Sequence, residues 1–273
     1  MTGREVTSTH SPRIKAARRL AKRTFRQRER AFLAEGPQAA GAALASGAEI
    51  TEVFATADAQ QRYPEVIAAA AGAGAAVRVV SGEVMADLAQ TVTPQGLLAV
   101  CRFIDVPLAE VTAARPRLAV LLAHVRDPGN AGTVLRTADA AGADAVIFTS
   151  ASVDPYNGKC VRASAGSLFH LPVVTGVQLA DVTRELRAAG MHVLAADSRG
   201  ARSLDDVIDD GTLSEPTAWM FGNEAWGLPA QARALGDEAV SVPIYGRAES
   251  LNLATAAAVC LYASARCQRP ATT

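Results

Sequence analysis

The sequence has few of the motifs that metal, disulfide or nucleotide chemistry needs. Its four cysteines form no Cys-x-x-Cys pair and show no zinc-ligand spacing, so we expect reduced thiols and no metal site. No Gly-x-Gly-x-x-Gly follows a strand pattern, and neither a Walker loop nor a Gly-x-Ser-x-Gly elbow occurs. Residues 72–74 are glycine-rich but follow a helical pattern, the wrong order for phosphate binding. These absences argue against serine hydrolases and nucleotide-dependent oxidoreductases.

Histidine is also scarce. The four histidines are scattered, and His124 and His192 fall inside apolar strand patterns. A histidine in such a pattern is more often a satisfied core residue than a catalyst, so we expect both to be buried structural residues. Acid–base chemistry centred on histidine is therefore not favoured.

Long apolar runs are missing as well. No stretch of about 18 residues is apolar and uncharged throughout, as a membrane-spanning helix requires. The N-terminus lacks the apolar core that a secretory signal carries behind its charges. We therefore expect a cytoplasmic protein without membrane segments.

Charge is abundant but unevenly placed. The formal net charge is zero, yet the first 35 residues hold ten Arg and Lys against three Glu, a local charge of +7, and the remainder carries −7. Ile14, Ala17, Leu20 and Ala21 recur at helical spacing within this basic segment, which predicts a helix with one apolar stripe. Such asymmetry favours a polyanion-binding arm. A merely solvated helix and a membrane-surface helix are the alternatives.

The candidate RNA-binding residues of this segment share a positive charge and lie within its predicted helical part. They are Arg18, Arg19, Lys22, Arg23 and Arg26.

The length of 273 residues exceeds what one core usually organises, so two domains are expected. Residues 31–103 alternate short apolar runs with helical patterns, as in a small α/β layer domain. Residues 105–117 contain Pro107 and Pro116 and are the best linker candidate.

From residue 118 onward, apolar strands alternate regularly with helical patterns, which predicts a mostly parallel sheet with helices on both faces. Residues 118–125 read as a strand buried on both sides, followed by a tight loop and a helix. Asn130 lies near the start of that helix, where it can act as a cap, and Arg136 can be an ordinary surface charge.

The chain from Trp219 to Cys267 reads as two apolar strands, each ending in a glycine-containing loop, and then an alanine-rich helix. Residues 241–246 form the second of these predicted strands, and Ser250 and Asn252 belong to the first turn of the helix. Ligands bind at the carboxyl ends of strands in open α/β sheets, so we expect the functional site here.

Three stretches then carry a specific resemblance. Residues 127–138, 221–228 and 242–252 resemble the three motifs of the SpoU/TrmH branch of the SPOUT RNA 2′-O-ribose methyltransferases. They occur in the family's order, with Asn and Arg six apart in the first and Ser and Asn two apart in the third. The resemblance covers residues 117–267, and residues 28–37 look like the start of the substrate-binding domain that many members carry in front.

The resemblance implies an α/β fold: a SPOUT-type parallel-sheet domain with a deep C-terminal trefoil knot, preceded by a small ribosomal-protein-like α/β domain that binds RNA. Pattern alone does not predict a knot, because knots are almost absent from proteins. Family members bind S-adenosylmethionine (AdoMet) in the knot and form homodimers with sites at the subunit interface. The expected division is a basic arm over 1–30, an RNA-binding domain over 31–104, a linker over 105–117 and the catalytic domain over 118–270.

The motif positions also imply site residues. Cofactor contacts are expected from Gly222, Val242, Ile244 and Leu251, whose loop backbone would hold the adenosine part. The implied catalytic set is Asn130, Arg136, Glu224, Ser250 and Asn252.

Each catalytic position has an expected role. Asn130 is expected to form a hydrogen bond with the ribose or with the cofactor side of the site. Glu224 is expected to orient Arg136 or the cofactor's polar end, and Ser250 and Asn252 to complete the network. A guanidinium does not release its proton readily in proteins, so a cation that fixes a phosphate and stabilises the developing alkoxide is favoured over a general base for Arg136.

Ribosomal RNA is the favoured substrate, because the front domain and the basic arm suit a large structured RNA. Transfer RNA and a catalytically inactive RNA-binding protein of the same fold are the alternatives. Trp226 stands where a small or acidic residue is common in the family, so the motifs do not identify the modified nucleotide. They also do not distinguish a role in ribosome maturation from one in antibiotic protection.

Overall fold

Two units make up the computed structural model, which describes residues 5–269. Of these residues, the first unit contains 5–104 together with Tyr156–His170, and the second contains Asp105–Pro155 and 171–269. The first four residues of the predicted basic arm and the last residue of the predicted catalytic domain lie outside the described residues. Tyr156–His170, which the sequence analysis placed in the catalytic domain, lie in the first unit.

The first unit is built on a four-stranded sheet in the order β1-β4-β2-β3. Its strands are β1 (Ala31–Glu35), β2 (Ile50–Ala55), β3 (Ala76–Val79) and β4 (Leu97–Arg102). β4 runs antiparallel to both of its neighbours, and β2 and β3 are parallel. The helices are α1 (Pro12–Arg19), α2 (Arg23–Glu29), α3 (Pro37–Ala45), α4 (Ala57–Arg62), α5 (Pro64–Gly72), α6 (Gly82–Leu88) and α9 (Gly158–Ala163), followed by the short helix η1 (Ser167–Phe169).

The basic segment forms two helices, α1 and α2, that belong to this unit. Ile14, Ala17 and Leu20 are buried, and they share a hydrophobic cluster with Val84 and Met85 of α6. The predicted apolar stripe is therefore present, although Ala21 beyond the end of α1 is exposed. Because its apolar face is covered by its own chain, the segment is a folded basic surface and not a free arm.

Aromatic rings hold the segment Tyr156–His170 within the first unit. Tyr156 stacks on Phe103 with ring centroids 3.9 Å apart and lies 4.7 Å from Phe32. Arg162 of α9 also pairs with Glu35 at the end of β1, at 3.1 Å. These contacts explain why the segment groups with the first unit.

The second unit contains a seven-stranded sheet in the order β7-β6-β5-β10-β8-β11-β9, in which every pair is parallel. The strands are β5 (Leu118–Leu122), β6 (Ala145–Thr149), β7 (Val173–Val177), β8 (His192–Ala196), β9 (Arg202–Ser203), β10 (Thr217–Phe221) and β11 (Glu238–Ser241). The helices are α7 (Leu108–Ala113), α8 (Pro128–Ala141), α10 (Leu179–Ala188), α11 (Leu204–Asp209), α12 (Ala230–Arg233) and α13 (Leu253–Gln268), with the short helix η2 (Thr212–Ser214).

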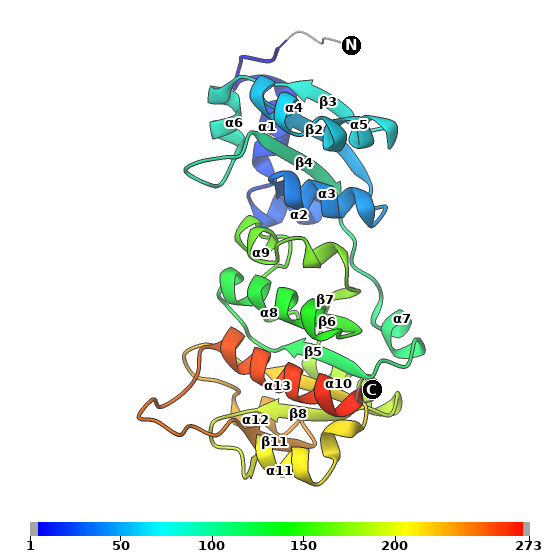
Figure 1. Ribbon diagram of the computed structural model, residues 1–273, viewed down its shortest axis with the longest axis vertical. Helices are drawn as coiled ribbons and strands as arrows, with labels where there is room; N and C mark the ends of the chain where they lie inside the picture. The colour runs from blue at the N-terminus through cyan, green and yellow to red at the C-terminus, as the bar shows by residue number, and fades with distance from the viewer. Residues whose placement is uncertain (1–4, 270–273) are drawn as a thin grey trace. The chain divides into compact units, whose positions relative to one another are not determined.

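The central strand β10 is buried on both faces. On one face, Ala218 and Met220 join a core cluster with Val182 and Leu186 of α10. On the other, the Trp219 indole N–H donates to the buried Ser264 hydroxyl of α13 at 2.8 Å. α13 also packs beside α8, as Figure 1 shows within this unit. The C-terminal helix is thus fixed against the strand that leads into the predicted site.

Several predictions about local structure are wrong. His124 follows β5 in a left-handed conformation with φ 63° and is half-buried, and His192 is exposed at the first residue of β8, so neither is a core histidine. The predicted linker contains α7, whose Leu108 and Val111 are buried in the core cluster. The predicted strand over 241–246 ends at Ser241, beyond which the chain leaves the sheet.

The cysteines give a first testable expectation. Burial raises the pKa of Cys101 and of Cys260 to about 12, Cys160 is also buried, and Cys267 is partly exposed. Only the thiolate reacts with Ellman's reagent. At pH 8 the reagent should therefore react rapidly with Cys267 in native protein and with the other three thiols only after unfolding. Four thiols reacting at one rate in native protein would contradict this burial pattern.

Candidate functional site

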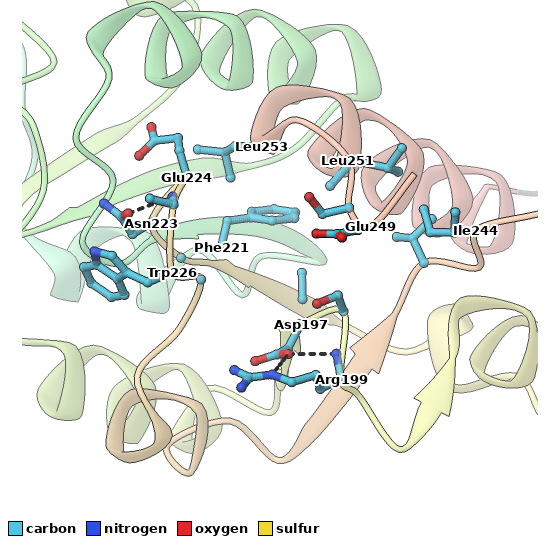
Figure 2. A pocket seen from close by; sticks show the side chains of 18 of the residues that line it. Asp197, Arg199, Phe221, Asn223, Glu224, Trp226, Ile244, Glu249, Leu251 and Leu253 are labelled. Atoms are coloured by element: carbon cyan, nitrogen blue, oxygen red, sulfur yellow. Dashed lines mark hydrogen bonds and ion pairs between the residues drawn. The ribbon is translucent and has the colours of Figure 1, made fainter. Parts of the chain in front are cut away.

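Three adjacent strands, β10, β8 and β11, end at one cavity of about 380 Å³ (Figure 2). This lies within the volume range of small-molecule sites. The lining residues are Ala196–Arg199 at and after the end of β8, Phe221–Gly227 at and after β10, Val240, Val242 and Ile244 at and after β11, and Glu249, Ser250, Leu251, Leu253 and Ala256 around the start of α13.

All four predicted cofactor residues line this cavity, although they come from three separate segments. Val242, Ile244 and Leu251 supply apolar side chains to its wall, which Phe221 also lines. Gly222 has a backbone reason to be glycine, because a Cβ there would lie 2.4 Å from the carbonyl carbon of Gly227. The motif loop therefore doubles back on itself at the cavity.

That loop is closed by reciprocal backbone hydrogen bonds between Asn223 and Gly227, each 2.9 Å long. The Asn223 side chain donates to the carbonyl of His124 at 3.2 Å and accepts from the N–H of Ala225 at 2.9 Å. Trp226 lies at its tip, half exposed, with its ring 5.7 Å from the His124 ring. The loop thus joins the end of β10 to the end of β5.

The structure brings three predicted catalytic residues into one hydrogen-bond network. The Asn130 side-chain N–H donates to Glu224 Oε1 at 3.4 Å, and Asn130 Oδ1 accepts from Asn252 Nδ2 at 3.1 Å. Asn252 is the cap of α13, since its Oδ1 accepts from the N–H of Ala254 at 2.8 Å. Residues far apart in the sequence, one from each motif, therefore meet beside the cavity.

Glu224 fixes the loop before α8. Its two carboxylate oxygens accept from the backbone N–H of Arg126 at 3.2 Å and of Asp127 at 3.0 Å. Asp127 is the cap of α8, because its side chain accepts from the N–H of Asn130 at 2.8 Å. The interpretation of Asn130 as the cap is therefore wrong, and its side chain is free for the network.

Arg136 lies apart from these groups. It is exposed on α8, does not line the cavity, and forms no hydrogen bond or ion pair with any residue in the range 5–269. Glu224 forms no hydrogen bond or ion pair with it, so the expectation that Glu224 orients Arg136 or the cofactor's polar end stays a prediction. Ser250, by contrast, lines the cavity as predicted.

A charged segment of the cavity, Asp197 with Arg199, was not predicted from the sequence. The Asp197 carboxylate accepts from the Arg199 backbone N–H at 2.8 Å and pairs with Arg199 Nε at 3.4 Å and Arg233 Nη1 at 3.2 Å. Burial raises the pKa of Asp197, but the hydrogen bonds from Arg199 and Arg233 outweigh it and hold that pKa below its ordinary value. The position of these residues directly after a strand was the available indication.

The predicted RNA-binding residues divide into two groups. Lys22 and Arg23 are exposed, Arg18 pairs with Asp87 at 2.9 Å, and the guanidinium of Arg19 lies 5.5 Å from the ring of Phe25.

Arg26 is different, because it is only 2% exposed and donates to the carbonyls of Leu20 and Ala21. It holds the corner between α1 and α2, so the prediction that it contacts RNA is wrong.

No helix within residues 5–269 is long and apolar enough to span a bilayer.

Comparison with known proteins finds two family matches along the chain. Residues 117–262 match the SpoU rRNA methylase family, and residues 11–99 match the MRM3-like substrate binding domain. The chain is 33% identical over 259 residues to the 23S rRNA (guanosine(2553)-2′-O)-methyltransferase RlmP of Bacillus subtilis, covering 95% of this chain and 98% of that protein.

Two further relatives are informative. A 23S rRNA (uridine(2479)-2′-O)-methyltransferase of Streptomyces viridochromogenes is 39% identical over 154 residues, 55% of this chain and 52% of that protein. The crystal structure of an AdoMet-bound rRNA methyltransferase from Sinorhizobium meliloti has a TM-score of 0.83 and 32% identity, covering 96% of this chain and 97% of that one. By its family match and by relatives similar over nearly its whole length, the chain belongs to the SpoU rRNA methylase family.

Proposed function

We propose that this protein transfers a methyl group from AdoMet to a ribose 2′-hydroxyl of 23S ribosomal RNA. One observation supports this most strongly: the residues of all three motifs surround or adjoin a single cavity at the carboxyl ends of β8, β10 and β11. The relatives named above act on 23S rRNA, one on guanosine and one on uridine. The shared motifs therefore support the reaction without specifying the base.

The residues around the cavity suit AdoMet. Apolar walls from Val242, Ile244 and Leu251 can hold an adenine ring, and the loop backbone after β10 offers N–H and carbonyl groups to it. The carboxylates of Glu224 and Glu249 give the cavity a negative character that matches a sulfonium and an ammonium group. When bound, the cofactor supplies a methyl group on an electrophilic sulfonium.

The contribution of the chain's own residues is orientation. Asn130 is held at both ends of its amide, by Glu224 and by Asn252, so its position beside the cavity is fixed. A fixed polar group there can align the ribose hydroxyl with the methyl donor, and alignment alone can supply several powers of ten in rate. The hydroxyl of Ser250 is a further polar group at the lining.

Arg136 is proposed to stabilise the developing alkoxide or to hold the adjacent phosphate. Because Arg136 lies outside its own chain's cavity, we propose that it acts in a homodimer whose site is completed by the second subunit. Val259 and Tyr262 of α13 are 39% and 55% exposed, and such apolar side chains suit a subunit interface. We also propose that the cavity loops form the trefoil knot expected for the family.

The first unit is proposed to bind the ribosomal RNA, in the cytoplasm, through the basic surface of α1 and α2. Replacing Lys22 and Arg23 together by Ala should weaken RNA binding. It should also make the dependence of log K on log salt shallower by about 1.4–1.8, because each neutralised phosphate contributes roughly 0.7–0.9 to the slope. Fluorescence anisotropy with an rRNA fragment at several salt concentrations measures both quantities.

The matched control is Arg62→Ala, which removes an exposed charge of the same unit outside the basic segment. Its slope should equal that of the wild type. An unchanged slope in the double variant would mean that the basic surface is only solvated.

Transfer RNA is the second candidate substrate. The relatives named as 23S rRNA methyltransferases favour ribosomal RNA. Incubation with tritiated AdoMet and either purified 23S rRNA or total transfer RNA separates the two. Label in rRNA alone supports the proposal, and label in transfer RNA alone overturns it. Binding of both RNAs without transfer would identify an inactive RNA-binding protein.

A further inference from the structure

The charges around the cavity are unbalanced. Among the described residues that line it, Arg199 is the one cation, and the charged groups beside it are the carboxylates of Asp197, Glu224 and Glu249. Figure 2 places Asp197 and Arg199 together on one side of the cavity, opposite Glu224. A ligand with both an anionic and a cationic end therefore meets distinct partners on the two sides.

The loop that carries Arg199 is held in place. Asp197, whose side chain is 4% exposed, accepts from the Arg199 backbone N–H at 2.8 Å. Gly200 lies so close to β11 that a Cβ would come within 2.7 Å of the Ala239 carbonyl oxygen and the Ser241 nitrogen. The base of the Arg199 side chain thus has a fixed position at the cavity.

The outer part of the guanidinium remains available. Its Nε faces Asp197 at 3.4 Å, and Nη1 and Nη2 form no hydrogen bond or ion pair within residues 5–269. The side chain is 70% exposed. Two neighbouring N–H groups of a guanidinium match the two oxygens of a carboxylate, a geometry that a lysine does not offer.

We propose that Arg199 binds the carboxylate of the methionine part of AdoMet. The inference rests on the proposed function, because it takes this cavity as the cofactor site. AdoMet carries a sulfonium, an ammonium and one carboxylate, and three of the cavity's four charged groups would repel that carboxylate. Arg199 is the partner that this end of the molecule requires, and an RNA phosphate is the competing occupant.

The test compares two uncharged-sulfur analogues by calorimetry. S-Adenosylhomocysteine retains the carboxylate and the ammonium group, whereas 5′-methylthioadenosine lacks both. In Arg199→Gln, the affinity for S-adenosylhomocysteine should fall about tenfold or more, because hydrogen bonds between charged groups are the strong ones. The affinity for 5′-methylthioadenosine should change less than twofold, which also verifies that the cavity is intact.

The matched control is Arg233→Gln, which removes the other guanidinium from Asp197 without changing a lining residue. It should leave both affinities within twofold of the wild type.

Other outcomes overturn the inference. Equal affinities of wild type and Arg199→Gln for S-adenosylhomocysteine, with a raised KM for RNA, would assign Arg199 to the RNA phosphate. An equal loss of affinity for both analogues would mean that Arg199 maintains the shape of the cavity and does not bind the carboxylate. Failure of wild-type protein to bind either analogue would overturn the proposed function itself, a result distinct from the first two.

Discussion

Replacing Arg136 by Ala should lower the rate of methyl transfer by about 10²–10³-fold, the usual effect of removing one donor that stabilises developing oxyanion charge. AdoMet affinity should stay within twofold of the wild type, because Arg136 is proposed to act on the RNA, at the developing alkoxide or the adjacent phosphate, and not on the cofactor. Single-turnover transfer from tritiated AdoMet gives the rate, and calorimetry gives the affinity. Arg136 is exposed and unpaired within the described residues, so its loss should leave the melting temperature unchanged.

Arg136→Lys is the matched control for this prediction. Lysine retains the charge but not the planar pair of donors, so a partial rate is expected. Mixing Arg136→Ala with Asn130→Ala should restore part of the activity if sites are shared between subunits. A full rate in Arg136→Ala, or a comparable loss of AdoMet binding, would contradict the proposed role.

Glu224→Gln should lower methyl transfer by about 10²-fold. Both carboxylate oxygens accept backbone N–H groups, from Arg126 and Asp127, and one also accepts from Asn130. A glutamine places an NH₂ group at one of the two oxygen positions. One orientation leaves the Arg126 N–H without an acceptor, and the other leaves both the Asp127 N–H and the Asn130 amide without one. The expected signature is a lower kcat with a smaller change in the KM for RNA, measured in steady-state transfer assays.

Glu249→Gln is a suitable comparison, because Glu249 also lines the cavity but no hydrogen bond or ion pair joins it to another described residue. It should lower kcat much less than Glu224→Gln does. Equal effects of the two variants would mean that cavity charge, and not the Asn130 network, explains the loss.

The larger elements followed from apolar patterning. The run over 118–125 contains β5, and the first apolar strand predicted from Trp219 onward falls in β10, because strands buried on both faces are continuously apolar. Short elements were missed: β9 has two residues, and α11 and α12 have six and four, too few for a period to appear.

The candidate site followed from motif order and spacing more than from local pattern. Asn130 and Asn252 are 122 positions apart, and only the folded sheet brings them into contact. Asn130 was interpreted as a possible cap because it stands near a helix start, but Asp127 occupies that position. Asp197 and Arg199 belong to no recognised motif, and their role at the cavity depends on which strands are neighbours in the sheet.

The basic segment illustrates a limit of charge counting. Its helical stripe was predicted from Ile14, Ala17 and Leu20, which are buried. The count could not separate Arg26, whose guanidinium is used inside the protein, from exposed neighbours such as Lys22 and Arg23. Burial of an individual charge depends on the corner between α1 and α2, which a sequence pattern does not specify.

The central claim is that the methyl group is placed on a ribose oxygen. The most direct measurement is alkaline hydrolysis of 23S rRNA labelled by wild-type protein and tritiated AdoMet, because a 2′-O-methyl group blocks cleavage of the following phosphodiester. Ribose methylation at one nucleotide predicts that the label is recovered in a single alkali-stable dinucleotide. Label recovered in mononucleotides would place the methyl group on a base and rule out ribose methylation.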